Sequence, residues 1–140
     1  MSRRRLTTTV AVVAGLVCCS AALWNKPARA ESKPGCRKVH TGQFRLANPN
    51  STTEISRTDS TQHEVNQQDG VEFVFKVRWL DECTYELYDK QMLKGPEKYR
   101  GQPTDVLRVH ITDVAARSYK AVATSNFSSL ELPVEMAIVR

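Results

Sequence analysis

The sequence has none of the short motifs that mark common catalytic, phosphate-binding or metal sites. It contains no HExxH, no G-x-S-x-G, no glycine-rich phosphate loop and no CxxC pair. Its three histidines, His40, His63 and His110, are scattered, and His63 and Glu64 would point to opposite faces of a strand. We therefore expect a protein without catalytic, cofactor-binding or metal-binding residues. An enzyme assembled from residues far apart in the sequence is the least favoured alternative.

The chain after residue 30 also lacks a surplus of positive charge. The whole chain holds 20 Lys and Arg against 15 Asp and Glu, a formal net charge of +5. This excess lies entirely in the first 30 residues, at Arg3, Arg4, Arg5, Lys26 and Arg29, so residues 31–140 carry no net charge. A protein that binds nucleic acid needs an excess of Lys and Arg on one face. We therefore do not expect nucleic acid as a partner.

No apolar run is long enough to cross a bilayer as a helix, which takes about 18 residues or more. The longest run, residues 10–23, follows the basic segment Met1–Arg5 and precedes the small-x-small sequence at residues 28–30. This order is typical of an export signal. The sequence predicts that residues 1–30 are a cleavable signal peptide. Residues 31–140 are then the mature protein, a single domain by size that does not span a membrane.

The route of export is read from the same segment. The general secretory route is favoured and would deliver the protein to the periplasm or the extracellular space. Residues 2–6 (SRRRL) partly match the twin-arginine signal, which is the alternative route. A lipoprotein is not favoured, because Cys18 and Cys19 follow Val17 and Cys18 rather than the small residue that usually precedes a lipidated cysteine.

The mature chain shows no helical period, and apolar and polar residues instead alternate as they do in half-buried strands. In the clearest strand, residues 71–79, one face is apolar and the other carries Glu72, Lys76 and Arg78. Its apolar face consists of Val71, Phe73, Phe75, Val77 and Trp79. Further strands are expected at residues 39–46, 52–66 (one long strand, or a hairpin turning near residues 59–60), 83–88, 107–111, 119–123 and 130–138.

Seven or eight short strands in this length predict an all-β domain. We expect a single antiparallel up-and-down sheet curled into a small barrel or half-barrel, which removes or shortens its edges. A β-sandwich is the alternative. In the hairpin after Trp79, a three-residue loop at residues 80–82 would pair Trp79 with Cys83 and keep the apolar face together. Pro133 predicts that the last strand lies at an edge or is bent there.

Only Cys36 and Cys83 remain after the signal is removed. An even number of cysteines in an exported protein favours a disulfide, which would contribute roughly 4 kcal/mol in the chain-entropy model. A reactive thiolate or a metal ligand is the alternative. No histidine lies near Cys83 in the sequence, and one histidine with two cysteines makes a poor zinc site.

Two groups of residues are candidates for binding. The first is the apolar row of Phe73, Phe75, Val77 and Trp79 with Tyr85, which would form the core or face a ligand inside the curled sheet. The second is a polar run between residues 57 and 64. Its members Arg57, Gln62 and Glu64 would form either an exposed strand and turn or a polar binding edge.

Several short segments of the mature chain form a recognisable set: CRKVHTGQF at 36–44, TEISR at 53–57 with QHE at 62–64, WLDECTYEL at 79–87 and ATSN at 123–126. Together they resemble a family of small exported bacterial proteins of unknown function. That family carries a tG-x-F segment, an R-x-(D/S)-x-Q-x-E segment and a WL-x-x-C-x-Y-x-L segment. The resemblance consists of short motifs that together span most of the mature chain. It implies membership of a family but no activity. The expected layout is also similar to small lipocalin-like barrels, by architecture alone.

Together these observations predict a non-catalytic, exported β-domain. Its expected function is to bind a small apolar molecule inside the curled sheet or a protein through its polar edge. An inhibitor of a lysozyme or protease is the alternative, and the charged loop at residues 94–104 would then reach the target.

Overall fold

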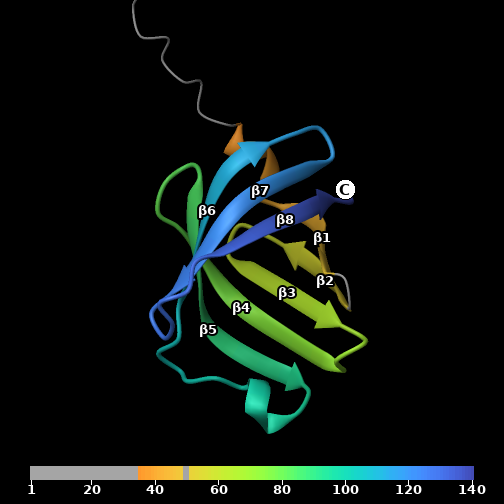
Figure 1. Cartoon of the computed structure of the whole chain (residues 1–140), viewed down its shortest axis with the longest axis vertical. Helices are drawn as coiled ribbons and strands as arrows, with labels where there is room; N and C mark the ends of the chain where they lie inside the picture. Colours follow the sequence, from red (N-terminus) through yellow and green to blue (C-terminus); the bar gives the residue numbers. More distant parts are fainter. Residues whose placement is uncertain (1–34, 49–50) are drawn as a thin grey trace, which may run out of the picture. The chain divides into compact units, whose positions relative to one another are not determined.

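The computed structural model describes residues 35–48 and 51–140, so the predicted signal peptide lies outside the described residues. Eight strands form a closed antiparallel barrel in which each strand pairs with the next along the chain, and β1 pairs with β8 (Figure 1). The strands are β1 (Gly42–Asn48), β2 (Ser51–Arg57), β3 (Thr61–Asn66), β4 (Val71–Trp79), β5 (Thr84–Lys94), β6 (Leu107–Val114), β7 (Ser118–Ser125) and β8 (Leu132–Ile138). The expectation of an all-β barrel is confirmed, and the sandwich alternative is wrong.

Two short 3-10 helices lie at opposite ends of the barrel. Helix η1 (Cys36–Val39) precedes β1, and η2 (Glu97–Tyr99) lies in the loop between β5 and β6. In Figure 1 the η1 end is at the top and the η2 loop is at the bottom. We name the two ends of the barrel after these helices, the η1 end and the η2 end.

The alternation of side chains places apolar residues inside the barrel. In β4, Phe75 and Val77 are buried, whereas Lys76 and Arg78, which alternate with them, are exposed. Successive side chains of a strand point to opposite faces, so a closed sheet with this pattern encloses an apolar core. The core side chains from the barrel are Phe44, Ile55, Phe75, Val77, Tyr85, Leu87, Val109, Ile111, Tyr119, Ala121 and Met136.

The first strand begins later than the sequence pattern predicts. Val39, expected at the start of a strand, is the last residue of η1 and is fully buried. The strand starts at Gly42, whose φ of 137° is a conformation that favours glycine. A Cβ at this position would lie 2.6 Å from the carbonyl oxygen of Arg140, so the chain passes too close here for any side chain. The physical reason for the difference is this glycine, which turns the chain from η1 into the sheet.

The β4–β5 hairpin has a different register from the one expected. Trp79 pairs with Tyr85, not with Cys83, and Val77 pairs with Leu87. Cys83 lies in the connecting turn, where its backbone N–H donates to Asp81 Oδ1 at 2.8 Å. This local bond lengthens the turn and shifts the pairing by two residues. Because side chains alternate with a period of two, the shift leaves every side chain on the face that was predicted.

Two of the strand ladders are short, and both stop on the η2 side. The β5–β6 ladder joins Thr84–Leu87 to Leu107–His110, and the β1–β8 ladder joins residues 44–46 to 136–138. Residues 132–135 of β8 therefore pair with β7 but not with the described part of β1. Pro133 lies in this stretch, opposite Val122 of β7, which fits the expectation that it needs an edge. Near η1 every pair of neighbouring strands is hydrogen-bonded, whereas near η2 the β5–β6 and β1–β8 pairs are not.

Candidate functional site at the open end of the barrel

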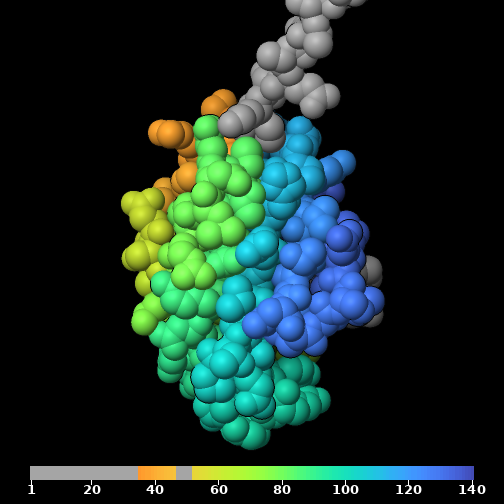
Figure 2. All heavy atoms as spheres, turned by 90° about the vertical axis from the view of Figure 1, so that its left-hand side faces the viewer, coloured from red at the N-terminus to blue at the C-terminus, as the bar shows by residue number. Residues whose placement is uncertain are grey.

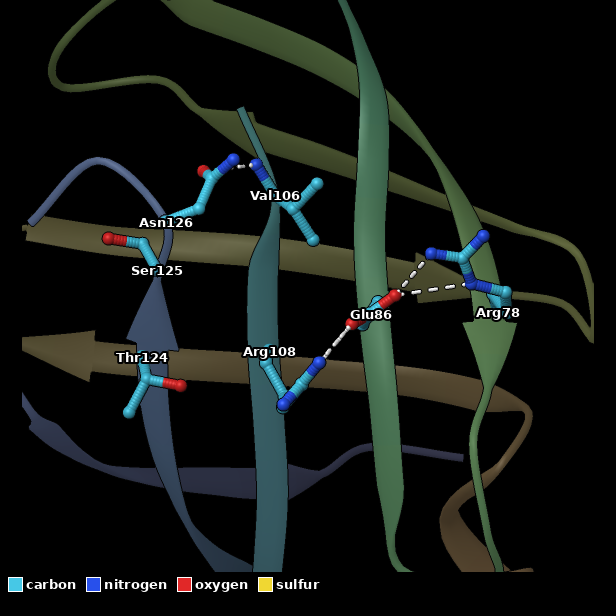
Figure 3. Close-up of a pocket in the computed structure, with 7 residues that line it drawn as sticks. All are labelled: Arg78, Glu86, Val106, Arg108, Thr124, Ser125 and Asn126. Carbon is cyan, nitrogen blue, oxygen red and sulfur yellow. Dashed lines mark hydrogen bonds and ion pairs between the residues drawn. The ribbon is translucent and has the colours of Figure 1, made fainter. Parts of the chain in front are cut away.

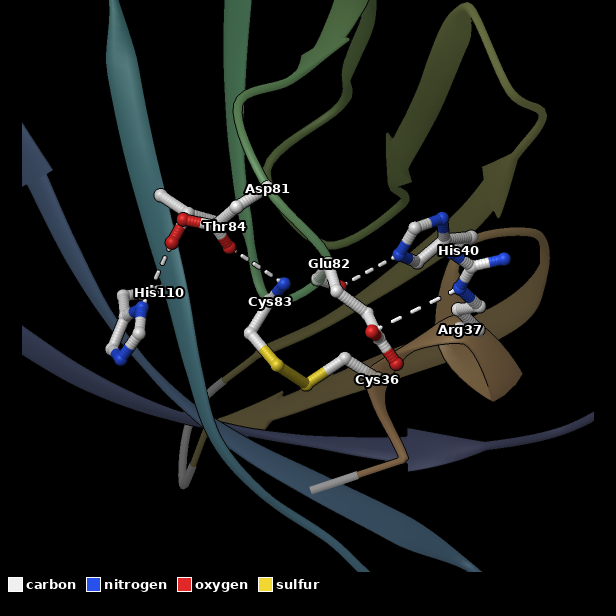
Figure 4. Close-up of a disulfide and its surroundings, with 8 residues drawn as sticks. All are labelled: Cys36, Arg37, His40, Asp81, Glu82, Cys83, Thr84 and His110. Carbon is white, nitrogen blue, oxygen red and sulfur yellow. Dashed lines mark hydrogen bonds and ion pairs between the residues drawn. A yellow bond between two sulfur atoms is a disulfide. The ribbon is translucent and has the colours of Figure 1, made fainter. Parts of the chain in front are cut away.

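Helix η1 closes one end of the barrel. Cys36 and Val39 of this helix are both fully buried, and a disulfide joins Cys36 to Cys83 with a Cα–Cα distance of 5.2 Å (Figure 4). The disulfide predicted from the sequence is confirmed. It ties η1 to the β4–β5 turn, so the helix is held over the end of the barrel by a covalent bond.

His40 and Trp79 strengthen this closure. The two rings stack with their centroids 3.5 Å apart and their planes 13° apart. The Nε2 atom of His40 also lies 2.8 Å from the carbonyl oxygen of Glu82, within the same turn as Cys83. The ring of Trp79 packs in turn against Tyr85, at 4.7 Å between centroids. Trp79 is therefore part of the closed end and not of an internal ligand site.

A buried arginine fills the middle of the barrel. Arg57 is 2% exposed, and its Nη2 donates to the hydroxyls of Tyr85 and Tyr119, both at 2.8 Å. Its Nη1 donates to the carbonyl oxygen of Val39 in η1 at 3.0 Å, and its Nε donates to Gln62 Oε1 at 2.6 Å. The guanidinium carbon also lies 4.4 Å from the centroid of the Tyr85 ring. Through these hydrogen bonds, the Arg57 side chain links η1 to strands β2, β3, β5 and β7.

The polar residues predicted as a binding edge are thus mostly inside. Arg57 and Gln62 are buried, and the barrel leaves no edge between β2 and β3 because these strands pair along their length. The expectation of an exposed polar edge at these two residues is wrong. The physical reason is that Arg57 shares the inner face with Ile55, where its hydrogen bonds to buried hydroxyls and carbonyls compensate for its loss of water. Only Glu64 of the three reaches the open end of the barrel.

The inner face changes character along the barrel axis. On the η1 side its side chains are buried, whereas the next inward positions toward η2 are half-buried. Ile111 and Val109 of β6, for example, are 1% and 6% exposed, but Leu107 on the same face is half-exposed. We call this half-exposed end of the inner face the cup, and its residues are Leu46, Phe73, Leu107, Ala123 and Val134, with Glu64 and Lys90.

The cup contains two groups of opposite charge. Glu64 Oε1 accepts a hydrogen bond from Gln62 Nε2 at 2.6 Å, at the end of the chain of contacts that begins at Arg57. Burial raises the pKa of the Glu64 carboxyl above its ordinary value, while the bond from Gln62 and the charge of Arg57 act in the opposite direction. Burial likewise lowers the pKa of Lys90, which the negative charges of Glu64 and Asp105 partly offset. The cup is therefore an apolar surface with an acid and a base set into it.

Lys90 faces inward because β5 has an irregularity beside it. The pairing with β4 shifts between Val74 and Lys76, and Asp89 adopts a positive φ of 49°. This turns Lys90 toward the interior, where its Nζ lies 4.0 Å above the ring of Phe73. The same Nζ donates to the carbonyl oxygen of Tyr99 and so holds the η2 loop next to the cup. Sequence alternation alone could not find this residue, because a bulge interrupts the period of two.

The apolar candidates divide between core and cup. Phe75, Val77 and Tyr85 are buried core residues, and Phe73 is the member of the row that is half-exposed in the cup. Three hollows on the described surface are lined by other residues, and none of them includes Phe73, Phe75 or Trp79.

No family model, curated protein or solved structure matches this chain. Among the described residues, no three His, Cys, Asp or Glu side chains lie close enough together to hold a metal ion. Within the same residues, no helix has the length and apolar character needed to cross a membrane. Function is therefore inferred from the side chains of the cup and of the barrel surface.

Proposed function

We propose that the protein is a non-catalytic binding module that takes a small, largely apolar molecule into the cup. The observation that supports this most strongly is the change along the inner face from buried to half-exposed side chains. Apolar surface on a soluble domain is normally covered, and small-molecule sites are mostly apolar with a few polar groups. The Cys36–Cys83 bond is compatible with the export that the sequence predicts.

The proposed ligand has one polar group. Phe73, Leu107 and Val134 would contact its apolar part, whereas Glu64 and Lys90 would hydrogen-bond its polar end. Such bonds fix orientation more than they add affinity, because each group gives up water in order to bind. A hydroxyl or amide on the ligand would donate to the acid and accept from the base without adding a charge of its own.

A pair of matched substitutions tests this proposal. Ala123→Trp would place a large ring inside the cup, whereas Val122→Trp would place the same ring on the outer face one residue earlier. The probe is N-phenyl-1-naphthylamine, a neutral apolar dye whose fluorescence rises in apolar surroundings. We expect the wild type and Val122→Trp to bind the dye saturably, and Ala123→Trp to lose most of this binding.

Two results would contradict the proposal. One is equal dye binding by Ala123→Trp and Val122→Trp with circular dichroism spectra like that of the wild type, because the dye would then bind elsewhere. The other is the lack of any saturable binding by the wild type. Native mass spectrometry of protein purified from its own host would identify the bound molecule directly.

An inhibitor remains the second candidate because the loop between β5 and β6 is exposed and has contacts of its own. Arg100 forms an ion pair with Glu97 within this loop, and Asp105 Oδ2 accepts from the backbone N–H of Gln102 at 2.8 Å. Lys98 at its tip is exposed and lies 4.8 Å above the ring of Tyr99. Rate measurements on a panel of lysozymes and proteases, with wild type and Lys98→Ala, would test this. Equal rates with and without the protein would refute it.

A further inference from the structure

A row of charged side chains crosses the outer face of the barrel, far from the inner surface that forms the cup. Arg78 of β4 pairs with Glu86 of β5, Glu86 pairs with Arg108 of β6, and Arg108 pairs with Thr124 of β7. These strands follow one another on the face shown in Figure 2, from β4 in green to β7 in blue. Residues paired across strands have neighbouring side chains on one face, so the row is continuous.

Glu86 lies between the two arginines and neutralises only one of them. Its side chain is 6% exposed, whereas those of Arg78 and Arg108 are 56% and 58% exposed. The hydrogen bonds from Arg78 and then from Arg108 hold the pKa of the Glu86 carboxyl below its ordinary value, so it is ionised at neutral pH. The three side chains therefore carry one net positive charge, and the two cations are the more exposed members.

Each arginine keeps donors that have no partner among the described residues. Arg78 donates to Glu86 Oε2 through Nε and Nη2, and Arg108 donates to Glu86 Oε1 through Nε and Nη2. The Nη1 group of each arginine has no hydrogen-bond partner in the part of the chain that the structure describes. Glu86 thus holds both guanidinium groups in place and leaves one edge of each free to donate to a ligand.

The surface next to this row is hollowed. A depression of about 340 Å³ is lined by the row together with Val106, Ser125 and Asn126 (Figure 3). Asn126 is fixed, because its Oδ1 accepts from the Val106 N–H at 2.9 Å and its Nδ2 donates to the Thr104 carbonyl at 2.8 Å. The hydroxyl of Thr124, opposite Arg108, is a further donor on the same rim.

We propose that this hollow is a second binding site and that its ligand carries an oxyanion, either a carboxylate or a phosphate group. The oxyanion would accept from the free Nη1 groups of Arg78 and Arg108, and the Thr124 hydroxyl on the rim would complete its contacts. The net positive charge of the site attracts either group, and its fixed arginines require little ordering on binding. It is independent of the cup, since it occupies the other face of the sheet.

The barrel contains a matched pair that lacks these properties. Arg45 and Glu54 form an ion pair on the outer face of β1 and β2, with Arg45 Nε 2.9 Å from Glu54 Oε1. Their side chains are 48% and 51% exposed, and the pair is neutral. An oxyanion that binds any exposed arginine would bind here equally well, so Arg45 separates a built site from general attraction.

The test uses the mature protein, titrated with inorganic phosphate and, in a second arm, with succinate. The Nε–Hε signals of the individual arginines are followed in proton–nitrogen NMR spectra. We expect saturable shifts at Arg78 and Arg108 and only small, non-saturating shifts at Arg45. The arm with the lower dissociation constant identifies whether phosphate or carboxylate is the preferred group.

Three variants are expected to change the affinity for the oxyanion in three different ways. Arg108→Gln removes one donor set and should weaken the binding about tenfold, the effect of losing one hydrogen bond to a charged group. Glu86→Gln removes the internal competitor and should strengthen it several-fold, a result that a merely destabilised variant would not give. Arg45→Gln should leave the affinity unchanged. The proposal is wrong if the shifts at Arg78 and Arg108 do not saturate, if Arg45 shifts as much as they do, or if Glu86→Gln weakens binding as Arg108→Gln does.

Discussion

The two ends of the barrel use the same alternating strands to different effect. At the η1 end a disulfide, a stacked His40–Trp79 pair and the buried Arg57 close the interior. At the η2 end the β5–β6 and β1–β8 ladders stop short, and the inner side chains are half-exposed. The comparison shows that the inner side chains are half-exposed where strand pairing ends and buried where the pairing is complete. The predictions below test this division.

The largest effect is expected from removal of the disulfide. Cys36→Ser with Cys83→Ser releases η1 from the β4–β5 turn and should lower the free energy of unfolding by about 4 kcal/mol. Urea denaturation followed by tryptophan fluorescence measures this, since Trp79 lies in the affected end. A loss below about 1 kcal/mol would show that the remaining contacts close the η1 end without the bond.

Equivalent truncations at the two ends should have unequal costs. Phe44, 1% exposed, packs edge-on against Tyr119 at 5.5 Å, and Phe44→Ala should cost about 3–4 kcal/mol in unfolding free energy. Phe73→Ala, in the half-exposed cup, should cost about 1–2 kcal/mol because less apolar surface is lost from the interior. Equal costs in thermal or urea unfolding would contradict the division of the barrel into a closed and an open half.

Arg57→Met should cost about 2–3 kcal/mol in unfolding free energy. The change leaves the buried carbonyl of Val39 and the hydroxyls of Tyr85 and Tyr119 without their donor. The control is Arg45→Met on the outer face, whose exposed ion pair should contribute less than about 1 kcal/mol. A smaller loss of unfolding free energy for Arg57→Met than for the control would show that the buried cation does not stabilise the barrel.

The smallest effect concerns pH, and two glutamates should respond in opposite directions. Burial raises the pKa of Glu64, so its contribution to stability is fully present below the unfolded pKa and is lost as pH rises through the folded pKa. The pKa of Glu86 is lowered by Arg78 and Arg108, so its contribution is present above the unfolded pKa and is lost as pH falls through the folded pKa. Carboxyl NMR titration should give Glu64 the higher pKa, and the reverse order would refute both assignments.

Much of the barrel follows from the alternation of side chains, because burial of one strand face is a local property of the sequence. The inward face of Phe75 and Val77 is an example, whereas the disulfide follows from the even number of cysteines. For the polar segment that ends at Glu64, the sequence pattern predicts an exposed position, because polar strand residues usually face solvent. The structure instead buries most of the polar side chains predicted as a binding edge. The signal that could have corrected this is the shared parity of Ile55 and Arg57.

The cup and the outer hollow depend on features that no local pattern records. Lys90 faces inward only because the pairing is irregular at Asp89. The side chain of Leu107 is half-exposed because the β5–β6 ladder ends at Leu87. The Arg78–Glu86–Arg108 row exists only because three strands pair in a particular register, which is fixed by the whole barrel. Such sites emerge from long-range pairing and could not be read from the sequence.

The most direct measurement of the central claim is a methyl NMR titration of the mature wild-type protein with N-phenyl-1-naphthylamine. The account predicts saturable shifts at the methyl groups of Leu46, Leu107 and Val134 in the cup. It predicts no comparable shifts at Val39 under the disulfide or at Val122 on the outer face. Shifts centred on Val39 or Val122, or no saturable shift anywhere, would contradict the claim that the barrel is closed at one end and binds apolar molecules at the other.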